Sequence, residues 1–369
     1  MRNNLKTNAF FDKQSSLGLK GIAIILMMFH HNFRDVSLFA PYDISFYPFS
    51  ESAVVSLCYT CKICVSIFAF ITGYGLYLSY EKSDDEPTKW VLRRYIRTFS
   101  RYGLIWVISA VICQIINGRT ASIMFQNGKI NGIFYSIIDF LGLANLFSSP
   151  TLDPTWWYMS AAAIYISIIP LLFRFKKYSW LILFWQSAFI RIIHTDNWYM
   201  GGVSAYSFLP PLILGFIFAQ YNYFEKILAI GQDSRWIKLY KFPLELWVIV
   251  AFYIMYNRFS IKMIWEFHYG LFPLLIIVFY LEFIEPIKYV RRLVCFLGKH
   301  SMSIFLTHTF IRGIYLADLT YSFKHFIPIT LFLLCTSLIL SLIINLFTKS
   351  IQYDRLIKRL ISALRFVII

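Results

Sequence analysis

The sequence predicts an all-α protein that crosses a membrane many times, and three observations support this fold class. The chain has 369 residues, of which 58% are apolar and only 15% are charged. Apolar stretches long enough to cross a hydrocarbon core of about 30 Å recur from end to end. The formal net charge is +16, and the cations cluster in short connections between those stretches. That distribution is typical of cytoplasmic loops and argues against nucleic-acid binding.

Eleven apolar segments are candidate membrane elements. A short polar tail with Lys6 and Lys13 precedes the first segment, and no small-residue cleavage site follows it, so we expect it to be retained as an anchor. No polar linker or sequence repeat divides the chain, which favours one transmembrane domain over residues 1–347. The segments cover residues 17–35, 53–80, 101–117, 132–148, 155–173, 179–193, 202–219, 243–258, 268–284, 296–316 and 326–347.

The positions of lysine and arginine predict the orientation of these segments. If residues 132–148 crossed the membrane fully, several later basic loops would lie outside. If this segment is instead re-entrant or interfacial, every strongly basic loop lies inside. Asp139, the internal glycines and the lack of flanking cations favour the second arrangement. We therefore predict about ten transmembrane helices, one extracytoplasmic half-element and two cytoplasmic termini.

The last residues, 348–369, are expected to form a basic cytoplasmic tail. Its sequence RLIKRLISALRFVII, residues 355–369, alternates basic and apolar residues with helical spacing. A helix of this kind is typical of segments that lie on the inner leaflet of a membrane. Membrane lipid is therefore an expected partner of the tail.

The first apolar segment carries the strongest candidate for chemistry. Lys20 and His31 are eleven residues apart, so on an ideal helix they share one face and lie about 16 Å apart along the axis. His30 points about 80° away from that face. Histidine titrates near neutral pH and can act as a general base. The alternative is a histidine that caps the helix or forms a hydrogen bond at the interface.

A second candidate is the arginine stripe at the start of the third segment. Arg94, Arg97 and Arg101 are spaced i, i+3, i+7 and so lie on one helix face at the expected inner surface. Guanidinium groups in such an array match phosphate oxygens bidentately. The alternative is that these arginines only fix the topology or contact anionic lipid.

The remaining candidates are weaker. His308 lies near the middle of a late segment, where it can line a cavity with His31 or simply pack against another helix. Trp157 lies at an expected outer boundary, where it can stack on a sugar ring or belong to the usual aromatic belt. Cysteines 58, 61 and 64 have a metal-like spacing without a fourth partner, so we expect buried thiols and no metal.

Taken in order, these segments resemble the bacterial membrane acyltransferase family 3, of the O-antigen and exopolysaccharide O-acetyltransferase type. The resemblance covers roughly residues 15–347. The chain departs from the family pattern at Lys20, where the family often has arginine. Lysine keeps the charge but lacks the planar guanidinium group that binds phosphate through two hydrogen bonds. The residues that carry the resemblance are Lys20 and His31, Thr72, Gly73 and Tyr74, Arg94 and Arg97, Trp157 and Tyr158, and Gly298, Ser301 and His308.

The resemblance implies an enzyme of the bacterial inner membrane that takes an acetyl or short acyl group from cytoplasmic acetyl-CoA. The acceptor would be a hydroxyl of a surface or lipid-linked glycan. We expect His31 to act as general base rather than to carry the acyl group, because no serine or cysteine stands beside it as a nucleophile. The implied roles are catalysis for His31, Lys20 and His308, donor binding for Arg94, Arg97 and Arg101, and substrate contact for Trp157, Tyr74 and His30.

Two other functions are compatible with a basic, polytopic membrane chain. One is a glycan transporter or polymerase, for which broken helices in two matching halves would be typical, and no such pair is evident. The other is a non-enzymatic sensor or scaffold. Substitution of His31 separates these alternatives from an acyltransferase, because only the enzyme depends on the imidazole.

Overall fold

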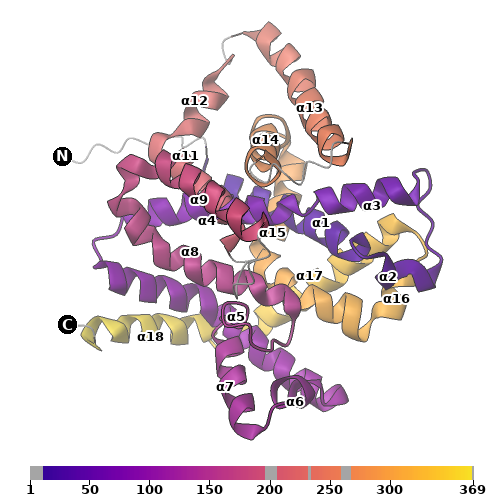
Figure 1. Ribbon diagram of the computed structural model, residues 1–369, viewed down its shortest axis with the longest axis vertical. Helices are drawn as coiled ribbons and strands as arrows, with labels where there is room; N and C mark the ends of the chain where they lie inside the picture. The colour runs from indigo at the N-terminus through magenta and orange to yellow at the C-terminus, as the bar shows by residue number, and fades with distance from the viewer. Residues whose placement is uncertain (1–10, 196–205, 232–233, 259–266, 368–369) are drawn as a thin grey trace.

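The computed structural model describes residues 11–195, 206–231, 234–258 and 267–367 (Figure 1). These residues form helices joined by turns and short loops, and their only extended pairing is an isolated bridge between Ser45 and His325. The predicted all-α class is therefore confirmed for the described part of the chain. The beginning of the segment predicted at 202–219 lies outside the described residues.

The helices follow one another through the whole chain. Several predicted segments are split between two elements: 53–80 is divided into α3 and α4, and 296–316 continues from α15 into a π-helical turn. The helices are α1 (Lys13–Phe33), α2 (Val36–Phe39), α3 (Glu51–Thr60), α4 (Ile63–Glu81), α5 (Pro87–Asn117), α6 (Arg119–Met124), α7 (Lys129–Phe140), α8 (Trp157–Arg174), α9 (Ser179–Thr195), α11 (Leu209–Tyr221), α12 (Tyr223–Ala229), α13 (Arg235–Arg258), α14 (Phe272–Phe279), α15 (Lys288–Thr309), α16 (Ala317–Tyr321), α17 (Phe326–Ser350) and α18 (Tyr353–Val367). Short 3₁₀ turns are η1 (Ala40–Tyr42), η2 (Pro154–Trp156) and η3 (Lys176–Tyr178), and π turns are η5 (Phe267–Leu271), η6 (Tyr280–Ile284) and η7 (Phe310–Tyr315).

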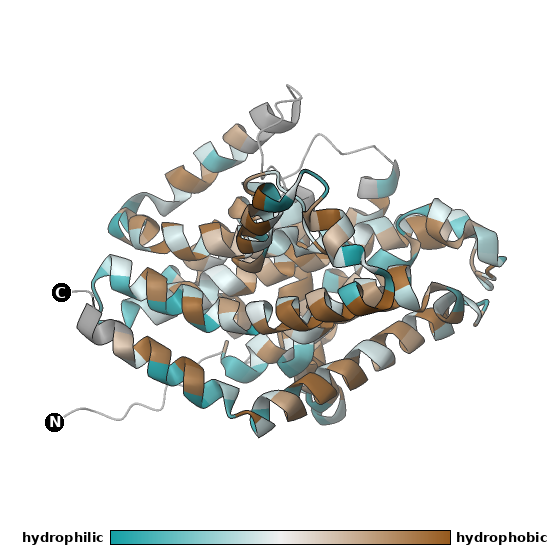
Figure 2. Ribbon diagram, turned by 90° about the horizontal axis from the view of Figure 1, so that it is seen from below, coloured by the Kyte–Doolittle hydropathy of each residue, from teal (hydrophilic) through white to brown (hydrophobic). Residues whose placement is uncertain are grey.

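Four helical runs in the described residues are long and apolar enough to cross a membrane: Glu51–Glu81, Pro87–Asn117, Pro154–Arg174 and Phe326–Ser350. Helix α1, with 21 residues, has a similar length of about 31 Å, but its lysine and histidines lower its mean hydropathy. Many large apolar side chains are exposed, as expected for contact with lipid. Figure 2 shows hydrophobic residues along most of the helices. The chain is thus a helical membrane protein, whereas ten spans and cytoplasmic termini stay predictions.

The segment 132–148 does not form one spanning helix. Helix α7 has 12 residues and rises about 18 Å, which is short of the hydrocarbon thickness. The buried carboxylate of Asp139 accepts hydrogen bonds from Trp106 Nε1 at 2.8 Å and from the Leu152 amide at 3.0 Å. These bonds hold the segment against α5, beside which α7 lies in Figure 1. The geometry agrees with a half-element at this position.

The backbones of α1 and α15 touch because glycine stands at both crossing points. A Cβ atom on Gly21 would overlap the carbonyl oxygen of Val294, and one on Gly298 would overlap that of Leu17. Small residues permit this close approach between membrane helices. The contact fixes the register of the two helices that carry His31 and His308. Elsewhere, Gly73 has the same role between α4 and α11, whereas nothing lies near Gly75.

Replacing Gly298 with valine should therefore destabilise the protein. The added methyl groups have no room against the backbone of α1, and overpacking of this kind costs about 1–3 kcal/mol. The matched control is Gly75→Ala, whose new methyl group meets no atom within 4 Å. Thermal unfolding in detergent should show a lower melting temperature for Gly298→Val alone. Equal melting of the two variants would contradict the tight crossing.

The C-terminal tail forms the helix α18, as the sequence predicted. This helix runs beside the first half of α5 (Figure 1), and Tyr353 Oη donates a hydrogen bond to the carbonyl oxygen of Ser100 at 2.8 Å. The tail is therefore fixed to the helical domain at its first turn. Its contact with the inner leaflet stays a prediction.

Candidate active site

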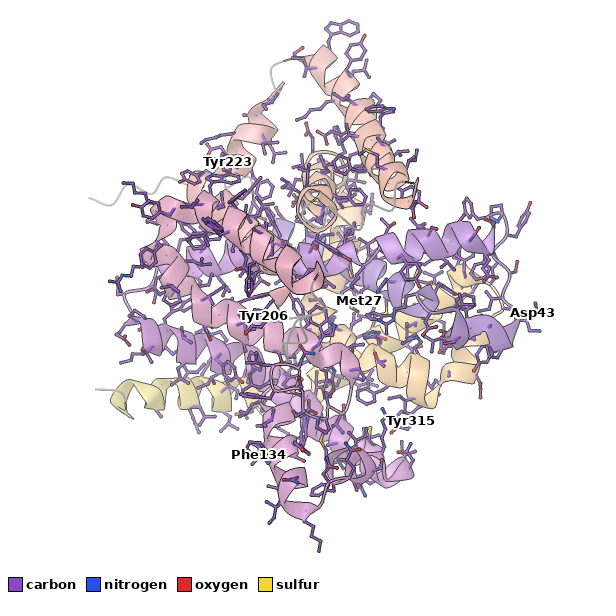
Figure 3. The ribbon with its side chains drawn as sticks, viewed as in Figure 1. Met27, Asp43, Phe134, Tyr206, Tyr223 and Tyr315 are labelled. Atoms are coloured by element: carbon purple, nitrogen blue, oxygen red, sulfur yellow. The ribbon has the colours of Figure 1, made fainter. Side chains whose placement is uncertain are left out.

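A cavity of about 340 Å³ lies between α1, α4, α5, α8 and α15. Met27, which lines it, lies near the middle of the molecule in Figure 3. The cavity brings together residues that are up to 285 positions apart in the chain, from Lys20 to Phe305. Its lining consists of Lys20, Met27, His31, Cys64, Val65, Phe68, Thr72, Leu76, Arg94, Arg97, Thr98, Thr155, Trp157, Tyr158, Met159, Ala162, Ile166, Ser301, Met302 and Phe305.

The charged residues of this lining are all cations. Lys20, Arg94 and Arg97 contribute positive charge, and no aspartate or glutamate lines the cavity. Arg94 Nε is buried without a hydrogen-bond partner. Burying unpaired cations away from water is costly, so an anion would stabilise such groups. Phosphate oxygens match the guanidinium geometry best.

Lys20 and His31 both line the cavity, as their shared face predicted. The cavity therefore runs along α1 from a cationic end to an imidazole about 16 Å further along the axis. His31 Nδ1 has no hydrogen-bond partner, which leaves the ring without a competing contact at that atom. His30, in contrast, does not line the cavity. Its Nδ1 pairs with the carbonyl oxygen of Cys58 at 2.9 Å, so the structure does not support the expected substrate contact.

His308 lies directly behind His31, with the two ring centroids 4.8 Å apart. It is fully buried and does not itself line the cavity. His308 Nδ1 is 2.7 Å from the carbonyl oxygen of Phe305, and Nε2 is 3.3 Å from Thr309 Oγ1. Because a carbonyl oxygen only accepts, Nδ1 carries the hydrogen in the neutral ring and Nε2 accepts from the threonine hydroxyl.

A chain of hydroxyl groups connects His308 to a buried carboxylate. Thr309 Oγ1 is 3.4 Å from Thr155 Oγ1, and the Thr155 hydroxyl donates to Asp153 Oδ1 at 2.8 Å. If His308 becomes protonated, Nε2 donates to Thr309 Oγ1, and the Thr309 hydroxyl can turn to donate to Thr155 Oγ1, while Thr155 keeps its bond to Asp153. The network thus accommodates both protonation states of the histidine pair. Asp153 is 0% exposed and holds this end of the network in place.

Two expected site residues lie elsewhere. Arg101 was expected to extend the arginine stripe, but it binds Ser303 at 3.1 Å and also contacts Thr348 and Asn345. Seven residues of helix place it on the face of Arg94 but about 10 Å deeper, where α15 and α17 surround it. Arg101 does not line the cavity beside Arg94 and Arg97 and joins three helices instead, so the structure does not support its expected role in donor binding.

Tyr74 was expected at the substrate, but its ring packs against Phe11 at 4.5 Å and Phe224 at 5.8 Å. Thr72, two positions earlier, lines the cavity. Residues two apart on a helix differ by about 200°, so Tyr74 faces away from the cavity when Thr72 faces into it. Tyr74 is absent from the cavity lining for this reason, and the structure does not support its expected role at the substrate. Trp157 does line the cavity, beside Phe208.

Sequence reasoning missed several residues around the histidine pair. Asp153 precedes a predicted span and gave no local signal. Cys64 lines the same cavity as His31, although its spacing with other cysteines drew attention elsewhere. Arg312 is buried, with Nε and Nη1 unpartnered, one helical turn after His308. Arg312 is an ionisable residue inside the predicted span 296–316, and that position is the signal that could have identified it.

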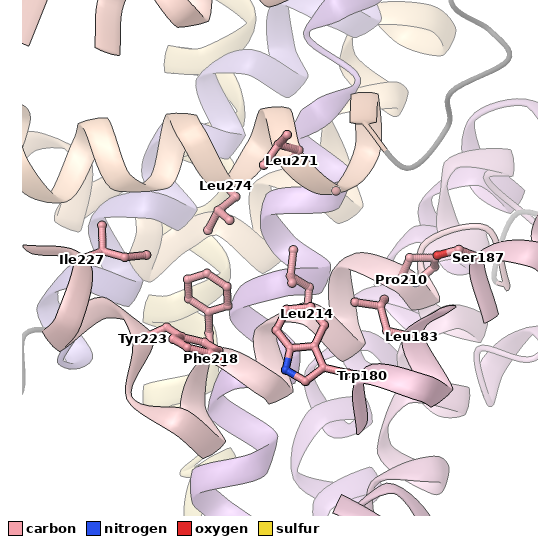
Figure 4. A pocket seen from close by; sticks show the side chains of 11 residues that line it. Trp180, Leu183, Ser187, Pro210, Leu214, Phe218, Tyr223, Ile227, Leu271 and Leu274 are labelled. Atoms are coloured by element: carbon pink, nitrogen blue, oxygen red, sulfur yellow. The ribbon is translucent and has the colours of Figure 1, made fainter. Parts of the chain in front are cut away.

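An apolar cavity elsewhere in the protein is larger. It measures about 480 Å³ and lies between α9, α11, α12 and α14 (Figure 4). Apolar side chains such as Leu183, Leu214 and Leu274 dominate its lining, and no aspartate, glutamate, lysine, arginine or histidine is among them. The lining of this cavity therefore offers no charged side chain and no histidine, and the cavity with His31 is the better candidate for the active site.

Comparison with known families agrees with this site. The family model of the acyltransferase domain, acyltransferase family 3, matches residues 13–346. Neither the curated proteins nor the solved structures contain a match. The matched region includes the cationic end of the cavity, His31 and the network behind it. The chain belongs to acyltransferase family 3 and is a membrane acyltransferase.

Proposed function

We propose that this protein transfers an acetyl or other short acyl group from cytoplasmic acyl-CoA to a hydroxyl of a surface or lipid-linked polysaccharide. The reaction would take place at the cytoplasmic membrane of a bacterium. One observation carries the proposal: a single cavity has three cations at one end and His31 at the other. Such a cavity suits a donor that is phosphorylated at one end and reactive at the other.

The dimensions of the cavity match the donor. The pantetheine arm of coenzyme A has a backbone about as long as four peptide residues, which extend to about 14 Å. The axial separation of Lys20 and His31 is about 16 Å. If Lys20, Arg94 and Arg97 hold the phosphates, the thioester reaches the imidazole without a change in the helices.

His31 is then the general base. It accepts the proton of the acceptor hydroxyl while the oxygen attacks the thioester carbonyl carbon. The carbon–sulfur bond breaks, the proton passes from His31 to the leaving thiolate, and the products are the ester and free coenzyme A. His308, in ring contact with His31, can share the positive charge with the hydroxyl network that ends at Asp153.

Thiol release by the purified protein tests this function. Protein in detergent or vesicles would receive acetyl-CoA with and without a glycan acceptor, and the acetylated glycan would be identified by mass spectrometry. We expect thiol release that depends on the acceptor. Glycan flux into vesicles without thiol release would favour a transporter instead.

Replacing Cys64 with alanine should leave most of the activity in place. Cys64 lines the cavity, so a covalent acyl-cysteine is the alternative to direct transfer. Direct transfer with His31 as base needs no thiol, and alanine is the smaller residue. We expect kcat within about threefold of the wild type, on the scale of a small packing change. A loss of about a thousandfold in thiol release would instead assign the cysteine as nucleophile.

A further inference from the structure

A second polar cavity adjoins the cationic end of the first. It measures about 260 Å³ and shares Arg94 and Arg97 with the cavity of His31. Its walls come from the end of α4, the connection to α5, the first turns of α5 and the C-terminal helix α18. The residues that line it are Ser79, Lys82, Ser83, Asp85, Trp90, Arg93, Arg94, Arg97 and Ile361.

The charges of this second cavity are mostly positive. Arg93 forms an ion pair with Asp85, so these two groups neutralise each other and order the α4–α5 connection. Within the described part of the chain, the other cations of the lining, Lys82, Arg94 and Arg97, face no further carboxylate in the cavity. Three cations around a small cavity suit a ligand with more than one phosphate group.

One wall of the second cavity is apolar. Trp90 is buried and meets Tyr80 edge to face, with the ring centroids 5.0 Å apart. Ile361 of α18 completes this wall. The hydrogen bond from Tyr353 to Ser100 holds α18 beside α5. An apolar wall next to phosphate-binding cations is the combination that accommodates a nucleotide, whose base is flat and whose sugar is phosphorylated.

We propose that this second cavity binds the phosphorylated adenosine end of the acyl donor. This inference rests on the proposed function and extends it. Arg94 and Arg97 stand where the two cavities meet, so they bind the diphosphate of a donor that occupies both. Lys82 binds the additional phosphate of the nucleotide, and α18 is part of the donor site through Ile361.

A donor that lacks the nucleotide distinguishes binding in the first cavity from binding in the second. S-acetyl-4′-phosphopantetheine retains the arm and one phosphate, so it occupies the first cavity alone. Replacing Lys82 with alanine should raise the KM for acetyl-CoA about tenfold, as expected for a lost charge-assisted hydrogen bond, and leave the KM for the truncated donor unchanged. The matched control is Lys89→Ala, on the first turn of α5 but in the lining of neither cavity.

A second pair of variants tests whether α18 forms part of the donor site. Ile361→Asp places a negative charge among the phosphate-binding cations, so it should also raise the KM for acetyl-CoA at least tenfold. Ser362→Asp adds the same charge at the next position, which is exposed and outside the lining. We expect the KM of this control to stay near the wild-type value with both donors.

The outcomes distinguish failure of the proposed nucleotide subsite from failure of the proposed acyl transfer. If Lys82→Ala and Ile361→Asp change neither KM, or change both donors equally, the nucleotide subsite is wrong while the acyl transfer stands. If the wild-type protein releases thiol from neither donor in the presence of acceptor, the proposed function is wrong. A tenfold change confined to acetyl-CoA supports both.

Discussion

Replacing His31 with glutamine is expected to lower kcat by about 10²–10⁴-fold, the usual contribution of a general base. Glutamine has a similar length and still forms hydrogen bonds, but it accepts no proton from the acceptor hydroxyl. His31 lines the cavity and its Nδ1 is unpartnered, so the substitution breaks no hydrogen bond of that atom. The folded protein should therefore persist. The initial rate of thiol release at saturating donor and acceptor measures the effect.

The neighbouring histidine provides the matched control. His30→Gln changes the same side chain one position earlier, on the same helix and at nearly the same depth. Because His30 binds the carbonyl oxygen of Cys58 and does not line the cavity, its substitution should leave kcat within a few fold of the wild type. If both variants lose activity equally, the loss reflects damage to α1 rather than a missing base. Full activity of His31→Gln would exclude the general-base mechanism.

The site could be predicted from the sequence where one helix determines the geometry. The placement of Lys20 and His31 on one face, with His30 turned away, follows from helical periodicity alone, and the cavity confirms it. Arg94 and Arg97 also lie together because they are one turn apart on the same helix. Such relations involve few residues and are independent of how the helices pack.

The rest of the site depends on packing between distant segments, which periodicity does not determine. Arg101 shares the face of Arg94, yet α15 and α17 cover it, and no local pattern indicates where a neighbouring helix begins to cover a stripe. The hydroxyl chain from His308 to Asp153 joins residues more than 150 positions apart, so it arises only from the packing of α15 against the loop before α8. The tight crossing at Gly298 sets the register of α15 against α1, and so of His308 against His31.

The half-element expected at residues 132–148 rests on the charges of the later loops and on Asp139, and its place in the membrane stays a prediction. Residues 132–148 read as an apolar segment of spanning length, but Asp139 and the glycines argued against a full crossing. In the structure the helix ends at Phe140, and the Asp139 carboxylate binds Trp106 and the Leu152 amide. A buried carboxylate needs such partners, and obtaining them folds the chain back on itself.

Replacing Arg94 with glutamine should raise the KM for acetyl-CoA about 10–100-fold and change kcat little. Arg94 lines both cavities and its Nε has no hydrogen-bond partner in the described structure, so we expect it to bind phosphate rather than to support the fold. A binding residue that acts equally in the ground state and the transition state alters KM without altering kcat. Arg94→Lys should recover only part of the loss, because lysine keeps the charge but not the bidentate geometry. Initial rates over a range of acetyl-CoA concentrations give both constants.

Arg101 offers the contrasting substitution on the same face of the same helix. Its guanidinium binds Ser303, Thr348 and Asn345, so Arg101→Gln should lower the melting temperature in detergent and leave the KM of the remaining folded protein unchanged. For Arg94→Gln we expect the reverse, a raised KM at an unchanged melting temperature. The two arginines are seven residues apart and look alike in the sequence, so opposite effects of the same substitution would separate binding from structure directly. If both variants instead lose stability and retain their KM, the cations near α1 support the fold and the phosphate-binding end of the cavity lies elsewhere.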